Sequence, residues 1–182
     1  MRVIGGFYRS RSLKMVGLDT TRETTDKVRG AIFNLISLYQ IKGNVLDLFA
    51  GSGAMGIEAL SRGAHNAYFN DLNHKAYLTI KDNLSSLGLE HVGFVSNLDY
   101  RQYLQKCKTK FDFVFLDPPY ALNVCADICE ELIQNDLLTV DGLIICEVEQ
   151  SICLKPCLGL EVYKERNYGI RKIVIFRRVK DA

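Results

Sequence analysis

Residues 44–64, NVLDLFAGSGAMGIEALSRGA, decide the fold. The run 44–50 favours a β-strand and leads into glycines at 51, 53 and 56, after which 52–63 can form a helix. Glycine permits a tight turn and lets a ligand approach the backbone, while the start of a helix offers unpaired N–H groups to negative charge. The stretch therefore predicts the first strand of an α/β sheet, followed by a ligand-binding loop.

The chain beyond this stretch alternates between strand-like and helix-like segments. Strands are expected at 67–71, 92–97, 111–117 and 142–149, and helices at 74–87, 99–106 and 124–135. Strands separated by helices predict a parallel sheet covered on both faces. Residues 160–179 read as two strands around a turn near Tyr168 and Gly169, which is too short for a crossover. The prediction is a doubly wound α/β domain that ends in an antiparallel hairpin at one edge.

Charge is segregated along the chain. Residues 1–42 carry eight Lys or Arg against three Asp or Glu, and residues 164–182 carry seven against two, whereas residues 43–163 carry eight against sixteen. We expect residues 1–42, with an amphipathic helix at 24–39, to be a basic extension that packs on a single domain at 43–182. Basic ends around an acidic centre suggest that the ends touch a polyanion, although a solvated basic surface explains the charge equally well.

Three acids follow or lie within the first strands. Asp71 ends the second strand 20 residues after Gly51, where it can accept hydrogen bonds from both hydroxyls of a ribose. Asp47 lies in the first strand, where it can meet an amino or cationic group, and Asp99 closely follows the third, where it can accept from an adenine amine. A dinucleotide site fits the glycines too, but a nucleoside cofactor fits all three acids better. None of the histidines at 65, 74 and 91 lies at a strand end to serve a dehydrogenase.

A second motif, FDFVFLDPPYA at 111–121, runs a strand into an acid and two prolines. Pro118 and Pro119 end the strand because neither has an N–H, and they stiffen the backbone beyond it. Asp117 and the Pro118 carbonyl can accept hydrogen bonds from an exocyclic amine, aiming its lone pair at an electrophile such as a sulfonium methyl group. Tyr120 can stack on an unpaired base. These groups predict methyl transfer to a nucleobase amine.

These motifs resemble those of a known family. The segments DLFAGSGAMGIEALSRGA (47–64) and FLDPPY (115–120) resemble S-adenosylmethionine-dependent methyltransferases with a D-P-P-Y motif. The segments RVIGGFYRSRSL (2–13), TRETTDKVRGAIFN (21–34) and YGIRKIVIFRR (168–178) are similar to RsmD-type enzymes, which methylate the 2-amino group of a guanine in bacterial 16S ribosomal RNA. The similarity extends over essentially the whole chain.

The resemblance implies a class I methyltransferase (Rossmann-like) fold of seven strands with the last antiparallel, and S-adenosyl-L-methionine as cofactor. The positions implied for cofactor binding are Asp47, Phe49, Ala50, Gly51, Gly53, Asp71, Leu72, Asn97 and Asp99. The implied catalytic loop is Asp117, Pro118, Pro119 and Tyr120. The candidates for contact with RNA are Arg2, Arg9, Arg11, Lys14, Arg22 and Arg29. The implied substrate is 16S rRNA in the small ribosomal subunit or its late precursor, and we expect a monomer.

Two positions depart from the usual family pattern. Glu23 stands where the family usually has proline, and the ribose acid is Asp71, preceded by Asn70, rather than glutamate after an apolar residue. A shorter carboxylate can still bind the ribose. An amino methyltransferase that acts on adenine or cytosine in DNA remains an alternative, although such enzymes normally carry a target-recognition insertion that this chain lacks. A non-catalytic RNA-binding module is more distant.

The remaining features favour a cytoplasmic protein without metal. The six cysteines include pairs four apart, Cys125/Cys129 and Cys153/Cys157, but no C-x-x-C, so small buried hydrophobic residues are favoured over a metal site. No apolar run approaches the ~18 residues of a membrane span, and the N-terminus lacks the apolar region of a signal peptide. Glu147 and Glu149 are most simply solvated acids at a strand end.

Overall fold

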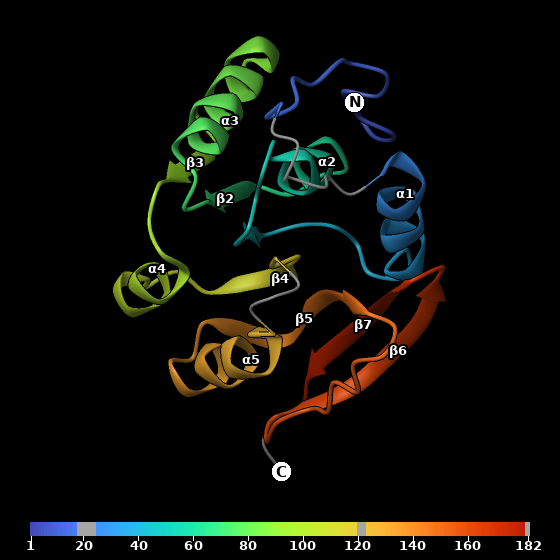
Figure 1. The fold of residues 1–182 in the computed structure, drawn as a ribbon. Helices are drawn as coiled ribbons and strands as arrows, with labels where there is room; N and C mark the ends of the chain where they lie inside the picture. Colours follow the sequence, from blue (N-terminus) through green and yellow to red (C-terminus); the bar gives the residue numbers. More distant parts are fainter. Residues whose placement is uncertain (18–24, 120–122, 181–182) are drawn as a thin grey trace.

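The computed structural model describes residues 1–17, 25–119 and 123–180, which form one sheet covered on both faces (Figure 1). The strand order is β3-β2-β1-β4-β5-β7-β6. The bounds are β1 (Asn44–Asp47), β2 (Asn66–Asn70), β3 (Gly93–Ser96), β4 (Phe111–Leu116), β5 (Leu138–Glu149), β6 (Leu160–Tyr168) and β7 (Arg171–Arg178). Strands β1 to β5 pair in parallel, whereas β7 lies antiparallel between β5 and β6. The predicted doubly wound sheet with an antiparallel hairpin at its edge is confirmed.

Five described helices cover the sheet (Figure 1). Those on one face are α1 (Asp26–Leu35), α2 (Ala54–Ser61) and α3 (His74–Leu87), and those on the other are α4 (Tyr100–Lys106) and α5 (Cys125–Gln134). The local sequence fixes their ends: Thr25 and Asn73 accept backbone N–H bonds at the starts of α1 and α3, and Gly88 ends α3 in the left-handed conformation.

Strand alternation decides which side chains reach each face of the sheet. Val45 and Phe115 belong to a first core cluster under α1 and α2, whereas Leu46 and Leu116 belong to a second cluster under α4 and α5. Because side chains alternate along a strand, the residues that follow Leu46 and Leu116 project toward the first cluster. These residues are Asp47 and Asp117, so both acids lie on the same face at the carboxyl ends of their strands.

The N-terminal arm, residues 1–17, is fastened to α2. The Glu58 carboxylate accepts hydrogen bonds from the backbone N–H groups of Ile4 and Gly5, both at 2.8 Å. Gly6 has a φ of +76°, and a Cβ there would lie 1.8 Å from the Ser61 carbonyl oxygen, so only glycine fits. Val3 and Leu13 of the arm belong to the first core cluster. The arm is thus held by the helix that follows the glycine loop.

Some predicted bounds were wrong. The first strand ends at Asp47 rather than residue 50, since the chain enters the glycine turn earlier, and β5 begins at Leu138 rather than residue 142. Asp141 has a φ of +63° within β5, and the register with β4 shifts in this part of the strand, so Asp141 and Gly142 form an irregularity inside β5. The helix expected at 24–39 spans Asp26–Leu35, and residue 24 lies outside the described residues.

Candidate active site

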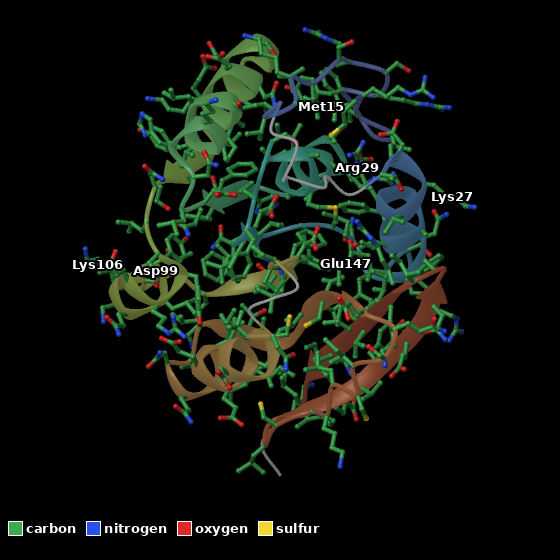
Figure 2. The ribbon with its side chains drawn as sticks, viewed as in Figure 1. Met15, Lys27, Arg29, Asp99, Lys106 and Glu147 are labelled. Atoms are coloured by element: carbon green, nitrogen blue, oxygen red, sulfur yellow. The ribbon has the colours of Figure 1, made fainter. Side chains whose placement is uncertain are left out.

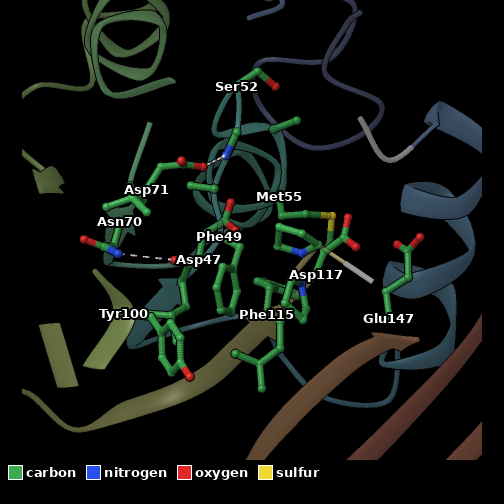
Figure 3. A pocket seen from close by; sticks show the side chains of 18 of the residues that line it. Asp47, Phe49, Ser52, Met55, Asn70, Asp71, Tyr100, Phe115, Asp117 and Glu147 are labelled. Atoms are coloured by element: carbon green, nitrogen blue, oxygen red, sulfur yellow. Dashed lines mark hydrogen bonds between the residues drawn. The ribbon is translucent and has the colours of Figure 1, made fainter. Parts of the chain in front are cut away.

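A cavity of about 710 Å³ lies at the carboxyl ends of the parallel strands, where the loop after β1 and the start of α2 line it (Figure 3). Its lining includes most of the residues expected from the sequence: Asp47, Phe49, Ala50, Gly51, Asp71, Leu72, Asp99, Asp117, Pro118 and Pro119. Tyr120 lies outside the described residues. The sheet therefore brings the glycine loop and the D-P-P segment to one cavity, as expected for ligands of open α/β sheets.

The glycine loop is joined to Asp71 by a hydrogen bond (Figure 3). The Gly51 backbone N–H donates to Asp71 Oδ2 at 2.8 Å, and the Asn73 N–H donates to Oδ1 at 2.8 Å. Each carboxylate oxygen has a further lone pair, so Asp71 can still accept from two hydroxyls. Gly51 has a φ of +54°, and a Cβ there would meet nothing within 4 Å, which leaves open space beside the loop. Loop and acid fit a ribose-bearing cofactor.

Two of the expected cofactor residues, Gly53 and Asn97, do not line the cavity but support it. Gly53 is the N-cap of α2 with a φ of +81°, and a Cβ there would come within 3.2 Å of Ile80. The Asn97 side-chain amide donates to the carbonyls of Asp71 and Leu72, at 2.8 and 2.9 Å. Both residues position the groups that face the cavity.

Asn70 connects the end of β2 to the segment after β3, and Asp99 in that segment begins α4. Asn70 is buried, its amide donates to the Leu98 carbonyl at 3.0 Å, and its side-chain oxygen accepts from the Leu98 N–H at 3.2 Å. This amide explains why a polar residue precedes Asp71, where sequence reasoning saw only a departure. Asp99 accepts from the Arg101 N–H at 2.9 Å as the N-cap of α4, and it also lines the cavity.

Asp47 is a buried acid of the cavity whose pKa is strongly raised. It is 4% exposed, and its Oδ2 accepts from the Gly56 N–H at 3.1 Å. Burial raises its pKa to about 7, the Gly56 hydrogen bond opposes the rise, and the neighbouring charges of Asp117 and Asp71 add to it. Asp47 therefore changes charge near neutral pH, within reach of both the glycine loop and the D-P-P segment.

Glu147 and Arg171 lie in the same cavity, which corrects the expectation that Glu147 is a solvated acid at the end of β5, whereas Glu149 is exposed as expected. Glu147 is 3% exposed and forms an ion pair with Arg171, which is 5% exposed. Asp117 and Glu147 lie at the same end of the cavity, with Met55 beside them (Figure 3). No local pattern identifies this pair, because its members are 24 residues apart and meet only when β7 pairs with β5.

The candidates for RNA contact fall into two groups. Arg2, Arg9, Arg11 and Lys14 are exposed on the N-terminal arm. Arg29 is fully buried, where its guanidinium donates to the Arg2 carbonyl and pairs with Asp26 and Glu58 (Figure 2). A side chain without exposed surface cannot contact RNA in this structure, so Arg29 joins α1 to α2 and the arm instead. Arg22 lies outside the described residues.

Phe7 is an exposed aromatic residue that sequence reasoning did not single out. Its side chain is 88% exposed on the arm, and its ring makes an edge contact with Tyr8. It lies in the same segment as Arg9 and Arg11. Large exposed aromatic rings next to cations are typical of surfaces that stack on unpaired bases.

The cysteines and the helices add two observations. Cys125, Cys129 and Cys146 are buried in the second core cluster, whereas Cys153 is exposed. Within the described ranges, no group of three or more His, Cys, Asp or Glu side chains could hold a metal ion. A search of those same residues finds no helix with the length and apolar character that a bilayer crossing requires.

Fold and cavity together define a class I methyltransferase, with a glycine loop after β1 and an acid at the end of each neighbouring strand. The solved structure of yhhF from Escherichia coli has a TM-score of 0.88 and 29% identity, and the match covers 100% of this chain and 99% of that chain. This likeness agrees with the fold expected from the motifs.

The chain belongs to the family described as Conserved hypothetical protein 95, whose profile matches residues 1–177. YlbH of Bacillus subtilis (strain 168) is 40% identical over 182 residues, covering 98% of this chain and 99% of that protein. Ribosomal RNA small subunit methyltransferase D of Haemophilus influenzae is 34% identical over 177 residues, covering 93% and 90%. The RsmD-type resemblance stated from the motifs is confirmed.

Proposed function

We propose that this protein transfers a methyl group from S-adenosylmethionine to the exocyclic 2-amino group of a guanine in 16S rRNA, within an assembled or nearly assembled small ribosomal subunit in the cytoplasm. One observation carries the proposal. Asp117, Pro118 and Pro119 line the same cavity as the glycine loop and Asp71. An acceptor for amine hydrogens would thus face a nucleoside site, in a family whose relatives include a ribosomal RNA methyltransferase.

The β1–β3 end of the cavity would hold the cofactor. Asp71 would accept hydrogen bonds from the ribose hydroxyls, Asp99 from the adenine amine, and Asp47 from the amino group of the methionine part. When bound, this cofactor supplies an electrophilic methyl group on a sulfonium. Phe49 and Tyr100, with ring centroids 5.5 Å apart, would form an apolar wall beside the bound cofactor.

The end of β4 would hold the acceptor amine. A guanine 2-amino group is a weak nucleophile because its lone pair is delocalised into the ring. Hydrogen bonds from its N–H groups to Asp117 and to the Pro118 carbonyl would favour the pyramidal amine and aim its lone pair. Positioning of this kind can supply much of the barrier reduction for an in-line transfer. Asp117 or water can then accept the proton released after methylation.

The N-terminal arm would position the RNA. Arg9 and Arg11 present exposed cations, and Phe7 an exposed ring, on an arm that Glu58 fastens to the helix after the glycine loop. Contacts between this arm and phosphates would set the location of the target guanine relative to the cavity without reading the base itself. Residues 1–42 would thus serve as the RNA-positioning element beside the methyltransferase domain at 43–182.

The test is transfer of a tritiated methyl group from S-adenosylmethionine to small ribosomal subunits that lack the modification, and to naked 16S RNA. Digestion and mass spectrometry identify the labelled nucleoside. Label on a guanine 2-amino group in subunits is the expected result. Label on an adenine or cytosine amine, or none on either substrate with cofactor binding confirmed by calorimetry, would overturn the proposal and redirect the search to DNA acceptors.

A further inference from the structure

A buried ion pair closes the end of the cavity beside Asp117. Glu147 near the end of β5 pairs with Arg171 at the start of β7, and both are nearly inaccessible to solvent while lining the cavity. Taking two charges out of water costs several kcal/mol per ion, so a buried pair is often no more stabilising than apolar residues of similar volume. Stability alone therefore does not explain why this cavity wall is charged.

The strand register places Glu147 level with Asp117. Leu116 pairs with Cys146, so the next residues on the two parallel strands, Asp117 and Glu147, follow at the same level. Neighbouring strands are ~4.8 Å apart, and both acids point away from the second core cluster that contains Leu116 and Cys146. Two carboxylates thus stand side by side on the face that bears the cavity.

Arg171 reaches the same edge because β7 runs in the opposite direction. Its first residue lies where the parallel strands end, and Arg171 alternates with Ile173 and Ile175, which face the first core cluster. The strand order β4, β5, β7 therefore arranges Asp117, Glu147 and Arg171 in sequence along one wall: acceptor, acceptor, donor.

We propose that Glu147 and Arg171 read the Watson–Crick edge of the acceptor guanine, an inference that rests on the proposed function. Along this edge guanine presents the 2-amino group, then the N1–H donor, then the O6 acceptor. With the 2-amino group on Asp117, the N1–H meets the Glu147 carboxylate and O6 meets the Arg171 guanidinium. A guanidinium carries five N–H donors in a planar fork, so it can bond a carboxylate along one edge and a carbonyl oxygen along another.

The same arrangement rejects the other bases that carry an amine. In adenine and cytosine the ring nitrogen next to the amine has no hydrogen and is itself an acceptor. Placed with its amine on Asp117, either base would set that nitrogen against the Glu147 carboxylate, leaving two buried acceptors facing each other without a proton. Unmatched buried polar groups are the strongest source of discrimination available to a binding site. Glu147 thus selects guanine over both alternatives.

The test uses small subunits reconstituted with 2-aminopurine in place of the target guanine, once mass spectrometry has located it. 2-Aminopurine keeps the 2-amino group but lacks the N1–H and O6. The wild-type enzyme should methylate it with a kcat/KM lower by roughly 100-fold, the size expected for losing charge-assisted hydrogen bonds. Glu147→Gln should lower kcat/KM on guanine and largely abolish the preference, because an amide can donate to the bare N1 of 2-aminopurine.

Glu149→Gln is the matched control, since Glu149 lies two residues further along β5 and is exposed. It should keep the wild-type preference. Equal rates of the wild-type enzyme on the two bases, or the same preference in the two variants, would overturn the inference. Binding of S-adenosylhomocysteine tests whether Glu147→Gln is folded. The comparison of guanine with 2-aminopurine on the wild-type enzyme does not depend on that variant. Absence of any guanine label in unmodified subunits would instead overturn the proposed function itself.

Discussion

The acidic cavity and the basic N-terminal arm are held in place by different means. Strand alternation and register set the cavity acids, so Asp47, Asp117 and Glu147 have little freedom in direction. The arm is anchored through its backbone, by Glu58 and by Ser61, whose hydroxyl accepts from the Tyr8 N–H at 2.9 Å, while its Arg side chains lie exposed. The cavity fixes the directions of its side chains, whereas the arm presents exposed charge. Changes in the cavity should therefore alter methyl transfer or cofactor affinity, and changes in the arm should alter the KM for subunits and its salt dependence.

The largest expected effect belongs to the cavity. Asp117→Ala should lower methyl transfer by about 1000-fold or more, because the acceptor amine loses the carboxylate that orients it. Cofactor affinity, measured by calorimetry with S-adenosylhomocysteine, should change little. Asp117→Asn keeps an acceptor oxygen and should retain more activity than the alanine variant. Unchanged turnover of Asp117→Ala would remove the residue from the catalytic role.

Asp47 tests whether burial controls charge in the cavity. Its pKa is about 7 in the folded protein against an ordinary 3.8, so the folded state favours the protonated form. The stability associated with protonated Asp47 is fully present below pH ~4 and is lost as the pH rises through ~7, up to roughly 4 kcal/mol. Asp47→Asn keeps the shape and an acceptor for the Gly56 N–H without the charge.

In thermal unfolding of the cofactor-free protein, the melting temperature of Asp47→Asn minus that of the wild type should therefore increase as the pH rises from 5 to 8. Asp127→Asn, an exposed acid of α5, serves as the control and should show no such trend. A pH-independent difference between Asp47→Asn and the wild type would mean that Asp47 is not protonated by burial.

Asp71 should affect the cofactor rather than the RNA. Asp71→Ala removes an acceptor for the ribose hydroxyls and also frees the Gly51 N–H from its hydrogen bond. The dissociation constant for S-adenosylhomocysteine should rise by about 10- to 100-fold, the range for hydrogen bonds to a charged acceptor. The salt dependence of subunit binding should stay as in the wild type. Calorimetry that shows no change in affinity would take Asp71 out of the site.

How much could be predicted from sequence differs between the two regions for a physical reason. The glycine loop, Asp71 and Asp117 follow strands with clear apolar patterns, and the topology of a parallel sheet then brings strand ends together. Glu147 and Arg171 needed the pairing of β5 with β7, which no local pattern specifies. Arg29 was mistaken for an exposed cation because its partner, Glu58, lies on another helix. Buried ion pairs between residues that are distant in sequence could therefore not be predicted from the sequence.

The smallest expected effect belongs to the arm. The double charge reversal Arg9→Glu with Arg11→Glu should raise the KM for small subunits by about 10-fold and leave cofactor affinity unchanged. The logarithm of the binding constant should also fall less steeply with the logarithm of salt concentration, by about one unit of slope for each phosphate that the arm no longer neutralises. Both substitutions change exposed side chains, so the fold should be kept.

Net charge alone could produce a similar loss, so the control carries the same change elsewhere. Lys106→Glu with Lys108→Glu reverses two exposed cations at and just after the end of α4, away from the arm (Figure 2). If the arm contacts RNA directly, subunit binding by the arm variant should depend less steeply on salt concentration than that of the wild type, and binding by the α4 variant should keep the wild-type slope. Equal salt-dependence slopes in the two variants would mean that the basic ends act only through the electrostatic field of the whole protein. Counterion release by direct phosphate contacts, in contrast, depends on where the cations lie.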